Sequence, residues 1–473
     1  MSEWLRASYS WITSELLTHL GFLLALVFLA NLLRQRRSPS STIAWLVTIL
    51  LMPYVGVPLY VMFGGRKMNP MARRKQRIYH RSPGMVAPGS AGEGTERLLA
   101  ASGVPPARPG NRFRLVVDGC DAYDQVVRLI DQARATIHIT TYILGGDPGS
   151  QAVIEHLSRR AGEGVAVRLL IDDVGSWRLR RRSLAHLVEA GAQVAYFMPV
   201  LHVPFRGRAN LRNHRKLIVV DGRIAMTGGM NLAWPYMGPP SATTLWRDIA
   251  AVVEGPAVAD LEAVFASDWK FTTGAEPEPA GEPAAAAPES PPGGDAAVVQ
   301  VVASGPDVAG DPLYESLLAL IFSARQRIWI VTPYFVPDEM LARALSLAAR
   351  RGVDVCVIVP VRSNHPSADL ARASYLRDLH NAGGRVLLYT PVMLHAKVVV
   401  FDNQLAVLGS ANMDMRSLFL NYEVALFVWS RPQVEEVSRW VAGLATQSQR
   451  ELPAPGWPLE IAENVVRLLS PLL

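Results

Sequence analysis

The sequence predicts an α/β protein with two tandem, similar α/β sandwich halves that form one pseudo-twofold site, preceded by an N-terminal transmembrane hairpin. Three observations lead to this prediction. Beyond Phe113, short apolar runs alternate with helix-length segments, which is typical of α/β layering. A series of short motifs occurs twice in the same order, which indicates an internal duplication. Two long apolar segments precede both copies.

The apolar segments near the N-terminus predict a membrane hairpin within residues 1–66. The first, at about 16–33, matches the roughly 18–20 residues that span a bilayer and ends at a run of arginines. A cleaved signal peptide is the alternative, but the segment lacks a preceding basic region and a clear cleavage site. The second, at about 43–63, contains two prolines and a glycine, so it is either a kinked span or a re-entrant segment. We expect two spans.

The net charge and the number of cysteines indicate which binding partners and which cellular compartment suit the protein. The net charge of +6 and pI near 9.4 suit an anionic lipid surface or a nucleic acid, or reflect an ordinary positive flank of a membrane protein. Basic residues from Arg66 to Arg81 place the rest of the chain in the cytoplasm, although the arginines of segment 34–37 oppose this if both segments span. Cys120 and Cys356 are too few for a disulfide framework or a zinc site and indicate a reducing compartment.

The repeat sets the domain boundaries. Three pairs of segments correspond in sequence and order: 132–139 with 323–330, 164–167 with 352–355, and 190–194 with 382–386. The expected parts are a basic flank and linker at 67–111, a first half at 112–273, a disordered Pro/Ala-rich linker at 274–297, a second half at 298–457 and an amphipathic tail at 458–473. We expect the tail to dock on the domain, with a position on the membrane surface as the alternative.

Each half contains one copy of a His-x-Lys-x4-Asp motif at the head of a β-branched run. Residues two apart share a face of an extended strand, so each His and Lys point the same way. An imidazole and an ammonium group projecting together suit a phosphate, and two copies suggest one site built from two halves. The copies are His214, Lys216 and Asp221 in the first half, and His395, Lys397 and Asp402 in the second.

Both motifs are followed by a turn of small residues and an asparagine, Asn231 or Asn412. Small residues let main-chain amides approach an anion, and the asparagine adds a side-chain donor. Farther along, Asp248 and Glu423 stand at comparable distances after the two motifs. Because a catalytic histidine needs an acidic partner to fix its tautomer, we expect these two carboxylates to orient the histidines.

These residues suit cleavage of a phosphodiester without a metal. One histidine attacks phosphorus as neutral imidazole, and the other donates a proton to the leaving alkoxide. The lysines and asparagines stabilise charge on the nonbridging oxygens. We include Asp221 and Asp402 among the candidate catalytic residues, although their position at the strand ends also suits a structural role in a turn. Neither a metal nor another cofactor is expected, since the sequence has no Walker loop, serine elbow or Cys/His metal spacing.

The duplicated motif resembles the hallmark of the phospholipase D superfamily, and the match is closer to its bacterial cardiolipin synthases. The resemblance covers nearly the whole chain except the linkers. It departs at Leu144, where the family usually has Phe, and in the long Pro/Ala-rich linker. The segments that carry it are 205–216, 332–339 and 409–417, with Asn421 and Glu423.

The resemblance implies transfer of a phosphatidyl group between two phosphatidylglycerol molecules, which gives cardiolipin and glycerol. By position, His214 would form a phosphatidyl-histidine intermediate, and His395 would protonate the departing glycerol and then deprotonate the incoming hydroxyl. The partners implied are phosphatidylglycerol and an anionic bilayer rather than nucleic acid. The implied location is the bacterial inner membrane, with a multi-pass anchor and a cytoplasmic catalytic domain.

Other functions remain open at this point. A hydrolytic phospholipase D or a phosphatidylserine synthase would use the same two-histidine mechanism. An enzyme of this fold that acts on nucleic acid and a duplicated fold with inactive motifs are weaker alternatives, because a membrane hairpin and two intact motifs do not favour them. The acceptor, whether phosphatidylglycerol, phosphatidylethanolamine or water, depends on the shape of the pocket and its access to the membrane.

Overall fold

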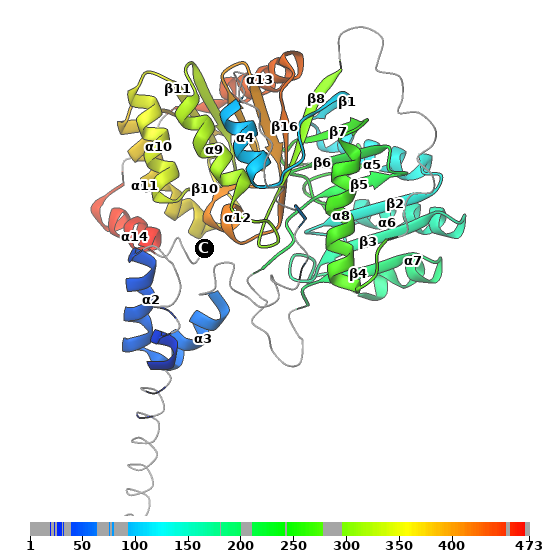
Figure 1. The fold of residues 1–473 in the computed structure, drawn as a ribbon, viewed down its shortest axis with the longest axis horizontal. Coiled ribbons are helices and arrows are strands. Elements are labelled where there is room, and N and C mark those ends of the chain that lie inside the picture. Colours follow the sequence, from blue (N-terminus) through cyan, green and yellow to red (C-terminus); the bar gives the residue numbers. More distant parts are fainter. Residues whose placement is uncertain are drawn as a thin grey trace, which may run out of the picture. The chain divides into compact units, whose positions relative to one another are not determined.

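The computed structural model describes most of the chain beyond residue 92 (Figure 1). The chain divides into an N-terminal unit, which includes residues 1–69, and a main unit, which includes residues 70–200 and 211–471. The described residues are 19, 23, 26–30, 32, 39–63, 75, 78–79, 93–179, 181–199, 211–241, 244–277, 296–450 and 455–468.

Two short apolar helices, α2 (Pro39–Leu51) and α3 (Pro53–Phe63), make up most of the described part of the N-terminal unit. The break between them falls before Pro53, because proline disfavours helical conformation in the residue that precedes it. Gly56 permits their close packing, since a Cβ there would lie 2.6 Å from the carbonyl oxygen of Thr48. A small cluster that includes Trp45 and Ile49 is buried in this unit.

The predicted hairpin therefore takes a different form where the structure describes it. The second predicted span, 43–63, is divided between the two helices, and most of the first, 16–33, lies outside the described residues. No helix in the described part of the chain has both the length and the apolar character needed to cross a membrane.

The main unit is built on a 15-stranded sheet. The strands of the first half are β1 (Arg108–Val116), β2 (Thr136–Thr141), β3 (Ala166–Asp172), β4 (Gln193–Phe197), β5 (Leu217–Val220), β6 (Ile224–Gly228) and β7 (Ala250–Glu254). Those of the second half are β8 (Ala297–Ser304), β9 (Arg327–Val331), β11 (Asp354–Pro360), β12 (Arg385–Tyr389), β13 (Val398–Phe401), β14 (Leu405–Gly409), β16 (Glu423–Val428) and β17 (Ser448–Gln449). A separate parallel pair joins β10 (Phe335–Val336) to β15 (Met413–Asp414).

The order of the strands confirms the duplication. From the centre outward the first half runs β1, β7, β6, β5, β2, β3, β4, and the second runs β8, β16, β14, β13, β9, β11, β12, β17. Corresponding strands thus occupy corresponding places. The halves meet where β1 pairs antiparallel with β8, with Asn111 opposite Ala297. Two similar α/β halves are therefore present, as the sequence predicts.

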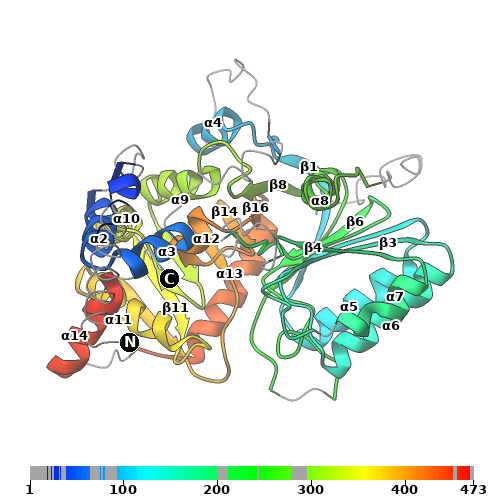
Figure 2. The same cartoon turned by 90° about the horizontal axis from the view of Figure 1, so that it is seen from below.

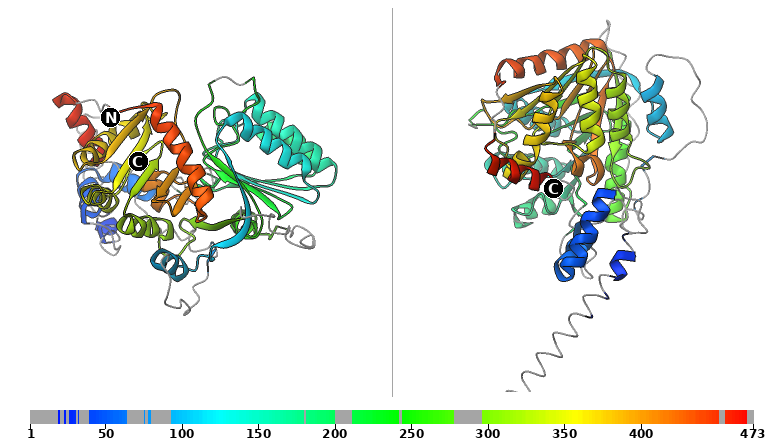
Figure 3. Two further views of the ribbon diagram at one scale, coloured as in Figure 1. Left: turned by 90° about the horizontal axis from the view of Figure 1, so that it is seen from above. Right: turned by 90° about the vertical axis from the view of Figure 1, so that its left-hand side faces the viewer.

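Helices cover the sheet in the same way in both halves. In the first half α5 (Gly119–Gln132), α6 (Pro148–Gly162) and α7 (Ala185–Glu189) lie on one face and α8 (Val258–Thr273) on the other (Figure 2). In the second half α9 (Pro312–Ser323), α10 (Glu339–Arg350) and α11 (Pro366–Asn381) lie on one face and α13 (Arg431–Thr446) on the other (Figure 3). The short helix α12 (Met415–Phe419) follows β15.

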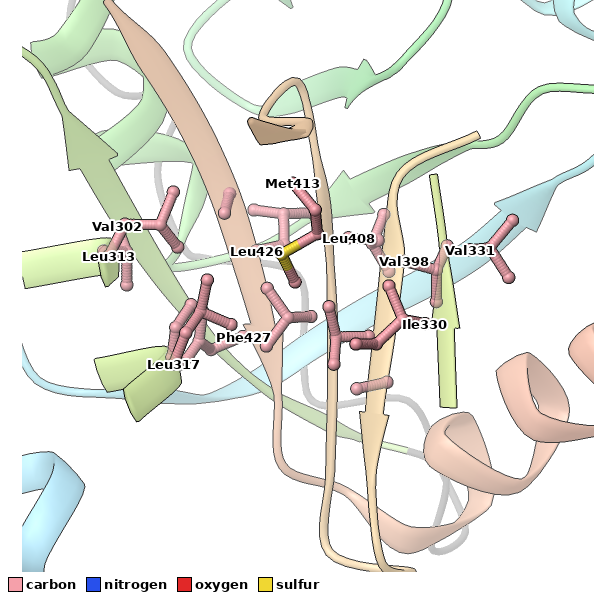
Figure 4. Close-up of a cluster of buried hydrophobic side chains, with 14 of the residues drawn as sticks. Val302, Leu313, Leu317, Ile330, Val331, Val398, Leu408, Met413, Leu426 and Phe427 are labelled. Atoms are coloured by element: carbon pink, nitrogen blue, oxygen red, sulfur yellow. The ribbon is translucent and has the colours of Figure 1, made fainter. Parts of the chain in front are cut away.

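Because helices cover both faces of the sheet, the inner strands are buried on both sides. Their sequences are therefore apolar throughout and do not alternate between apolar and polar residues. Almost every residue of β3 and β11 is buried. Figure 4 shows part of the resulting core, where Leu317 of α9 lies beside Phe427 of β16, and Leu313 lies beside Val302 of β8. Each such side chain contributes about 1.5–3 kcal/mol by leaving water.

The predicted linker 67–111 contains secondary structure where the structure describes it. Within it lie the helix α4 (Glu93–Ala101), the start of β1 and the buried side chains of Lys75 and Tyr79. Helix α4 contacts α9 of the second half, so this short polar helix packs on the main unit. Most of the predicted linker 274–297 lies outside the described residues.

The predicted C-terminal tail forms α14 (Trp457–Leu468), which contacts α11. The tail docks on the domain as predicted, through polar and apolar contacts: Arg377 of α11 donates to the buried carboxylate of Glu463, and Val466 packs against the main core. Trp457, Ile461 and Val465 are 71%, 53% and 51% exposed, so much of the apolar face points away from the domain.

Candidate active site

The two motifs lie where the chain enters equivalent strands of the two halves. Strand β5 begins one residue after Lys216, and β13 begins one residue after Lys397, so each His-x-Lys pair precedes the strand in which it was predicted. Main-chain bonds join these entry segments to the opposite half. The His214 amide donates to the Tyr422 carbonyl at 2.9 Å, and the His395 amide donates to the Arg247 carbonyl at 2.7 Å.

Each motif histidine is paired with a carboxylate of the other half. His214 Nδ1 lies 3.0 and 3.1 Å from the two carboxylate oxygens of Glu423, and His395 Nδ1 lies 2.7 Å from Asp248 Oδ2. A carboxylate at Nδ1 favours the tautomer that carries its proton there and leaves Nε2 with a lone pair. The site is therefore incomplete in either half alone.

Burial is the main influence on the histidine pKa values. It lowers the pKa of His214 to about 4, with Glu423 opposing the shift and Lys216 adding to it. Burial and the nearby ammonium group of Lys397 lower the pKa of His395 to about 3, although Asp248 opposes the shift. Lys397 Nζ lies only 2.8 Å from His395 Nδ1. Both imidazoles are therefore neutral at pH 7 in the free protein.

The carboxylates are ionised. Burial by itself raises the pKa of Asp248 and of Glu423, but the facing histidine and the buried lysines bring both pKa values below their usual range. Ser410 Oγ also donates to Glu423 at 2.5 Å. Each pair consequently consists of a neutral imidazole and an anionic partner, which can stabilise an imidazolium when it forms.

The two lysines are buried beside the histidines. Lys216 Nζ donates to the His214 carbonyl at 2.6 Å, and Lys397 Nζ donates to the His395 carbonyl. Burial lowers the pKa of Lys216 to about 7 and that of Lys397 to about 8. A bound phosphate would favour their charged forms, because an opposite charge stabilises an ammonium group.

The histidines and the two predicted asparagines line one cavity of about 340 Å³. Asn231 Oδ1 accepts from the Ile143 amide at 3.2 Å, which orients its side chain, and Asn412 stands at the equivalent place of the second half. Neither lysine is among the described residues that line the cavity. The arrangement brings two imidazoles and two amides around a space large enough for a phosphodiester.

The small residues after each motif also adjoin the carboxylates that face the histidines. A Cβ on Gly229 would lie 2.2 Å from Asp248 Oδ1, so the glycine makes room for the carboxylate that contacts His395. The residue at the corresponding place is Ser410, whose hydroxyl donates to Glu423.

The motif aspartates hold turns. The Asp221 carboxylate accepts from the amides of Arg134, Ala135 and Thr136 at 2.7–2.9 Å. Asp402 accepts in the same way from the amides that begin β9. Both residues have positive φ, 53° and 50°. Neither is among the described residues that line the cavity, so their contacts suit a structural role.

Sequence reasoning missed a buried charge cluster next to His214. Arg215 donates to Asp268 at 2.6 Å and lies 3.4 Å from Asp307, and Lys75 bonds both carboxylates. Arg215 Nε also donates to the carbonyl of Glu423, the partner of His214. The one available signal was the identity of the middle motif residue, which is Arg in the first copy and Ala in the second.

The described residues contain no cluster of three or more His, Cys, Asp or Glu side chains suited to hold a metal ion. Two neutral imidazoles, each with an anionic partner from the other half, can divide nucleophilic attack and proton transfer between them. Together with the duplicated sheet, this site defines a phospholipase D-like protein.

Comparison with known proteins identifies the family. The family described as cardiolipin synthase, phospholipase D-like domain, matches residues 126–269 and 317–444, and a phospholipase D-nuclease N-terminal family matches residues 23–65. The chain therefore belongs to the cardiolipin synthase family of phospholipase D-like proteins.

Individual relatives and a solved structure agree with this assignment. The chain is 32% identical to a cardiolipin synthase of Halalkalibacterium halodurans, over 99% of this chain and 95% of the relative. It is 33% identical to cardiolipin synthase 1 of Bacillus anthracis, over 93% and 90%. The crystal structure of phosphatidylserine synthase from Haemophilus influenzae Rd KW20 has the same fold, with a TM-score of 0.60 and 16% identity over 80% of this chain and 100% of that one.

Proposed function

We propose that the protein is a phosphatidyltransferase that joins two phosphatidylglycerol molecules into cardiolipin and releases glycerol. The observation that carries this proposal is the crosswise pairing of His214 with Glu423 and of His395 with Asp248 around one cavity. Similarity over nearly the full length to relatives named cardiolipin synthase supports the choice of reaction.

In the first step, His214 Nε2 attacks the phosphorus of one phosphatidylglycerol. The N–P bond forms as the P–O bond to glycerol breaks, and His395 gives a proton to the leaving oxygen. Glycerol departs and the phosphatidyl group remains on His214. The depressed pKa of His214 keeps it neutral and able to attack. The choice of His214 as nucleophile rests on the resemblance to the family.

In the second step, a hydroxyl of another phosphatidylglycerol gives its proton to His395 and attacks the same phosphorus. The N–P bond breaks, which frees His214 and completes cardiolipin. His395 must be protonated before the first step, yet its pKa is low in the free protein. An anionic phosphodiester in the cavity raises that pKa by favouring the charged imidazolium. Lys216, Lys397 and the two asparagines would stabilise the charge on phosphorus oxygens.

We further propose that residues 1–66 anchor the protein in the bacterial inner membrane as a hairpin, with the catalytic unit in the cytoplasm. The support is the apolar character of segments 16–33 and 43–63, the basic residues that follow them, and the match of 23–65 to an N-terminal family. Exposed apolar side chains on α2, such as Ile43 at 60% and Leu51 at 76%, suit lipid contact.

The test is to reconstitute the full chain in vesicles with labelled phosphatidylglycerol and identify the lipid products. Cardiolipin and glycerol should form, and His214→Ala or His395→Ala should abolish both. The matched control is His156→Ala: His156 Nδ1 lies 2.7 Å from Asp131, so it too pairs with a carboxylate, but it is outside the cavity lining. Phosphatidic acid as the sole product would replace the proposal with a hydrolase.

A further inference from the structure

Among the described residues, the two halves contribute unequally to the wall of the cavity. In the second half, the 16-residue helix α11 follows β11, and residues at its start, among them Asn364 and Ser367, line the cavity. At the corresponding place in the first half, after β3, a 3-10 helix (Arg181–Leu184) and the five-residue helix α7 follow, and neither reaches the lining. One wall of the pseudo-symmetric site therefore contains residues that have no counterpart in the described part of the other half.

Asp414 distinguishes this wall most clearly. It is the one carboxylate among the described residues that line the cavity, and it stands two residues after Asn412. The corresponding residue of the first half, two after Asn231, is Ala233. Asp414 Oδ1 accepts from the Ser417 amide at 2.7 Å and so caps α12, which holds the side chain in place.

The Asp414 carboxylate suits hydroxyl groups rather than phosphate, whereas the guanidinium of Arg416, which lines the same cavity and opposes the rise in the pKa of Asp414, suits the neighbouring phosphate. A carboxylate repels an anionic phosphodiester, but it accepts strong hydrogen bonds from alcohols. Burial raises the pKa of Asp414 to about 6, so it remains mostly ionised at neutral pH. On the same wall Tyr334 donates to Asn364 Oδ1 at 2.5 Å, which adds uncharged polar groups. The arrangement fits a neutral polyol placed next to a phosphate.

We propose that Asp414, together with Asn364 and Tyr334, forms a subsite that binds the glycerol hydroxyls of the phosphatidylglycerol headgroup. The inference rests on the proposed transferase function and names the group that its acceptor must carry. The departing glycerol and the attacking hydroxyl occupy the same side of phosphorus, because the second step reverses the first. One subsite therefore serves both. It belongs to the half that supplies His395, the histidine proposed to exchange protons with this oxygen.

The subsite gives a physical basis for transfer to an alcohol instead of to water. A headgroup held by its outer hydroxyls places its reactive hydroxyl beside the intermediate, whereas water gains no such binding. Loss of the Asp414 charge should therefore reduce the preference for polyols while the first chemical step continues.

The test measures how the full chain, in vesicles of labelled phosphatidylglycerol, distributes phosphatidyl groups between deuterated glycerol and 1-propanol at equal concentrations. Wild type should favour glycerol. Asp414→Asn and Asp414→Ser both retain a good helix cap, and each should lower the glycerol-to-propanol ratio by about tenfold, the effect of one charge-assisted hydrogen bond. Total phosphatidyl transfer should fall far less than in His214→Ala.

The matched control is Asp338→Asn. Asp338 also caps a helix, accepting from the Leu341 amide at 3.2 Å, but it is not among the described residues that line the cavity. It should leave the ratio unchanged. A ratio that is unchanged in both Asp414 variants would overturn the subsite while leaving the transferase proposal intact. Phosphatidic acid as the sole wild-type product would overturn both.

Discussion

His214 and Glu423 are 209 residues apart in the sequence, yet Nδ1 of the histidine lies 3.0 Å from a carboxylate oxygen of the glutamate. His395 and Asp248 make the reciprocal contact at 2.7 Å. The carboxylate that orients each histidine is thus delivered by the other half. Duplication here produces one shared site, because neither half holds both members of a pair.

The first prediction concerns this shared pairing. Glu423→Gln keeps the shape of the side chain but removes the charge that fixes the His214 tautomer and stabilises its charged form. We expect kcat for cardiolipin formation to fall by roughly 10²–10⁴-fold, by analogy with loss of the acid from a catalytic triad. Steady-state kinetics in vesicles measures the change.

Glu262→Gln is the matched control for that variant. Glu262 Oε1 lies 2.6 Å from Nδ1 of the buried His138, so it forms a similar pair away from the described cavity lining. Its kcat should stay near that of wild type. A Glu423→Gln enzyme with wild-type kcat would show that Glu423 is not needed to orient His214.

The second prediction concerns pH. The nucleophile must be neutral, so kcat/KM should fall as pH drops through the pKa of His214, about 4. The lysines must be charged, so kcat/KM should fall as pH rises through about 7 to 8, the pKa values of Lys216 and Lys397. Between these limits kcat/KM should decline as pH rises, because His395 must take up a proton for the first step and its pKa in the free protein is about 3. An acid limb near 6.5, the ordinary value for histidine, would contradict the depressed pKa.

The third prediction tests the space reserved for Asp248. Gly229→Ala places a methyl group against the Asp248 carboxylate, where a Cβ would lie at 2.2 Å. Displacing the carboxylate weakens its bond to His395, so kcat should fall at least tenfold even if the protein remains folded. Gly162→Ala is the control, because a Cβ at Gly162 meets nothing within 4 Å. Equal activity of the two variants would contradict the proposed contact.

The fourth prediction separates structure from chemistry at the motif aspartates. Asp221→Asn retains one oxygen but loses the charge that binds the amides of residues 134–136. We expect the free energy of unfolding to fall by about 1–3 kcal/mol, because hydrogen bonds to a charged group are lost. Denaturant titration measures this change, and kcat of the folded enzyme should remain within a few-fold of wild type. A large loss of kcat without loss of stability would instead make Asp221 catalytic.

The fifth prediction concerns the buried cluster beside the site. Arg215→Met leaves Asp268 and Asp307 with Lys75 as their remaining cation in the cluster. We expect the free energy of unfolding to fall by about 3–5 kcal/mol, as is usual when one partner of a buried ion pair is removed. Arg431→Met is the control, since Arg431 makes a solvent-exposed pair with Glu435. Similar stability of the two variants would contradict an important role for the cluster.

The sequence repeat made the strand topology predictable. The pairing of each histidine with a carboxylate of the other half could not be predicted in this way. Equal motif spacing implies equivalent strands, and the sheet order follows from that. Asp248 and Glu423 stood out as candidates for the same reason. Their spacing after the motifs is compatible with a contact to the histidine of the same half or of the other half. The fold selects the second, because the segment that leads into β5 lies beside Tyr422 and the segment that leads into β13 lies beside Arg247.

Other features left no pattern that sequence reasoning could use. The helix α4 is short and polar, so it resembled a linker although it packs in the main unit. Asp414 lies within segment 409–417, which carries the family resemblance, but its place in the cavity depends on the pairing of β15 with β10 in the folded chain. Lys75 stood in a run of basic residues that suggested only a membrane flank, and its burial against Asp268 and Asp307 depends on folding of the main unit.

The most direct test of the account is to trap the intermediate. The His395→Asn enzyme lacks the proton donor of the first step, so it is given a phosphorus-labelled phosphatidyl ester of p-nitrophenol, whose leaving group needs no proton. It cannot deprotonate the incoming hydroxyl, so the label should accumulate on the protein as an acid-labile adduct. Peptide mapping should place that adduct on His214, and His214→Asn should abolish it. An adduct on another residue, or cardiolipin formed by the doubly substituted His214→Asn, His395→Asn enzyme, would contradict a site in which these two histidines perform the chemistry.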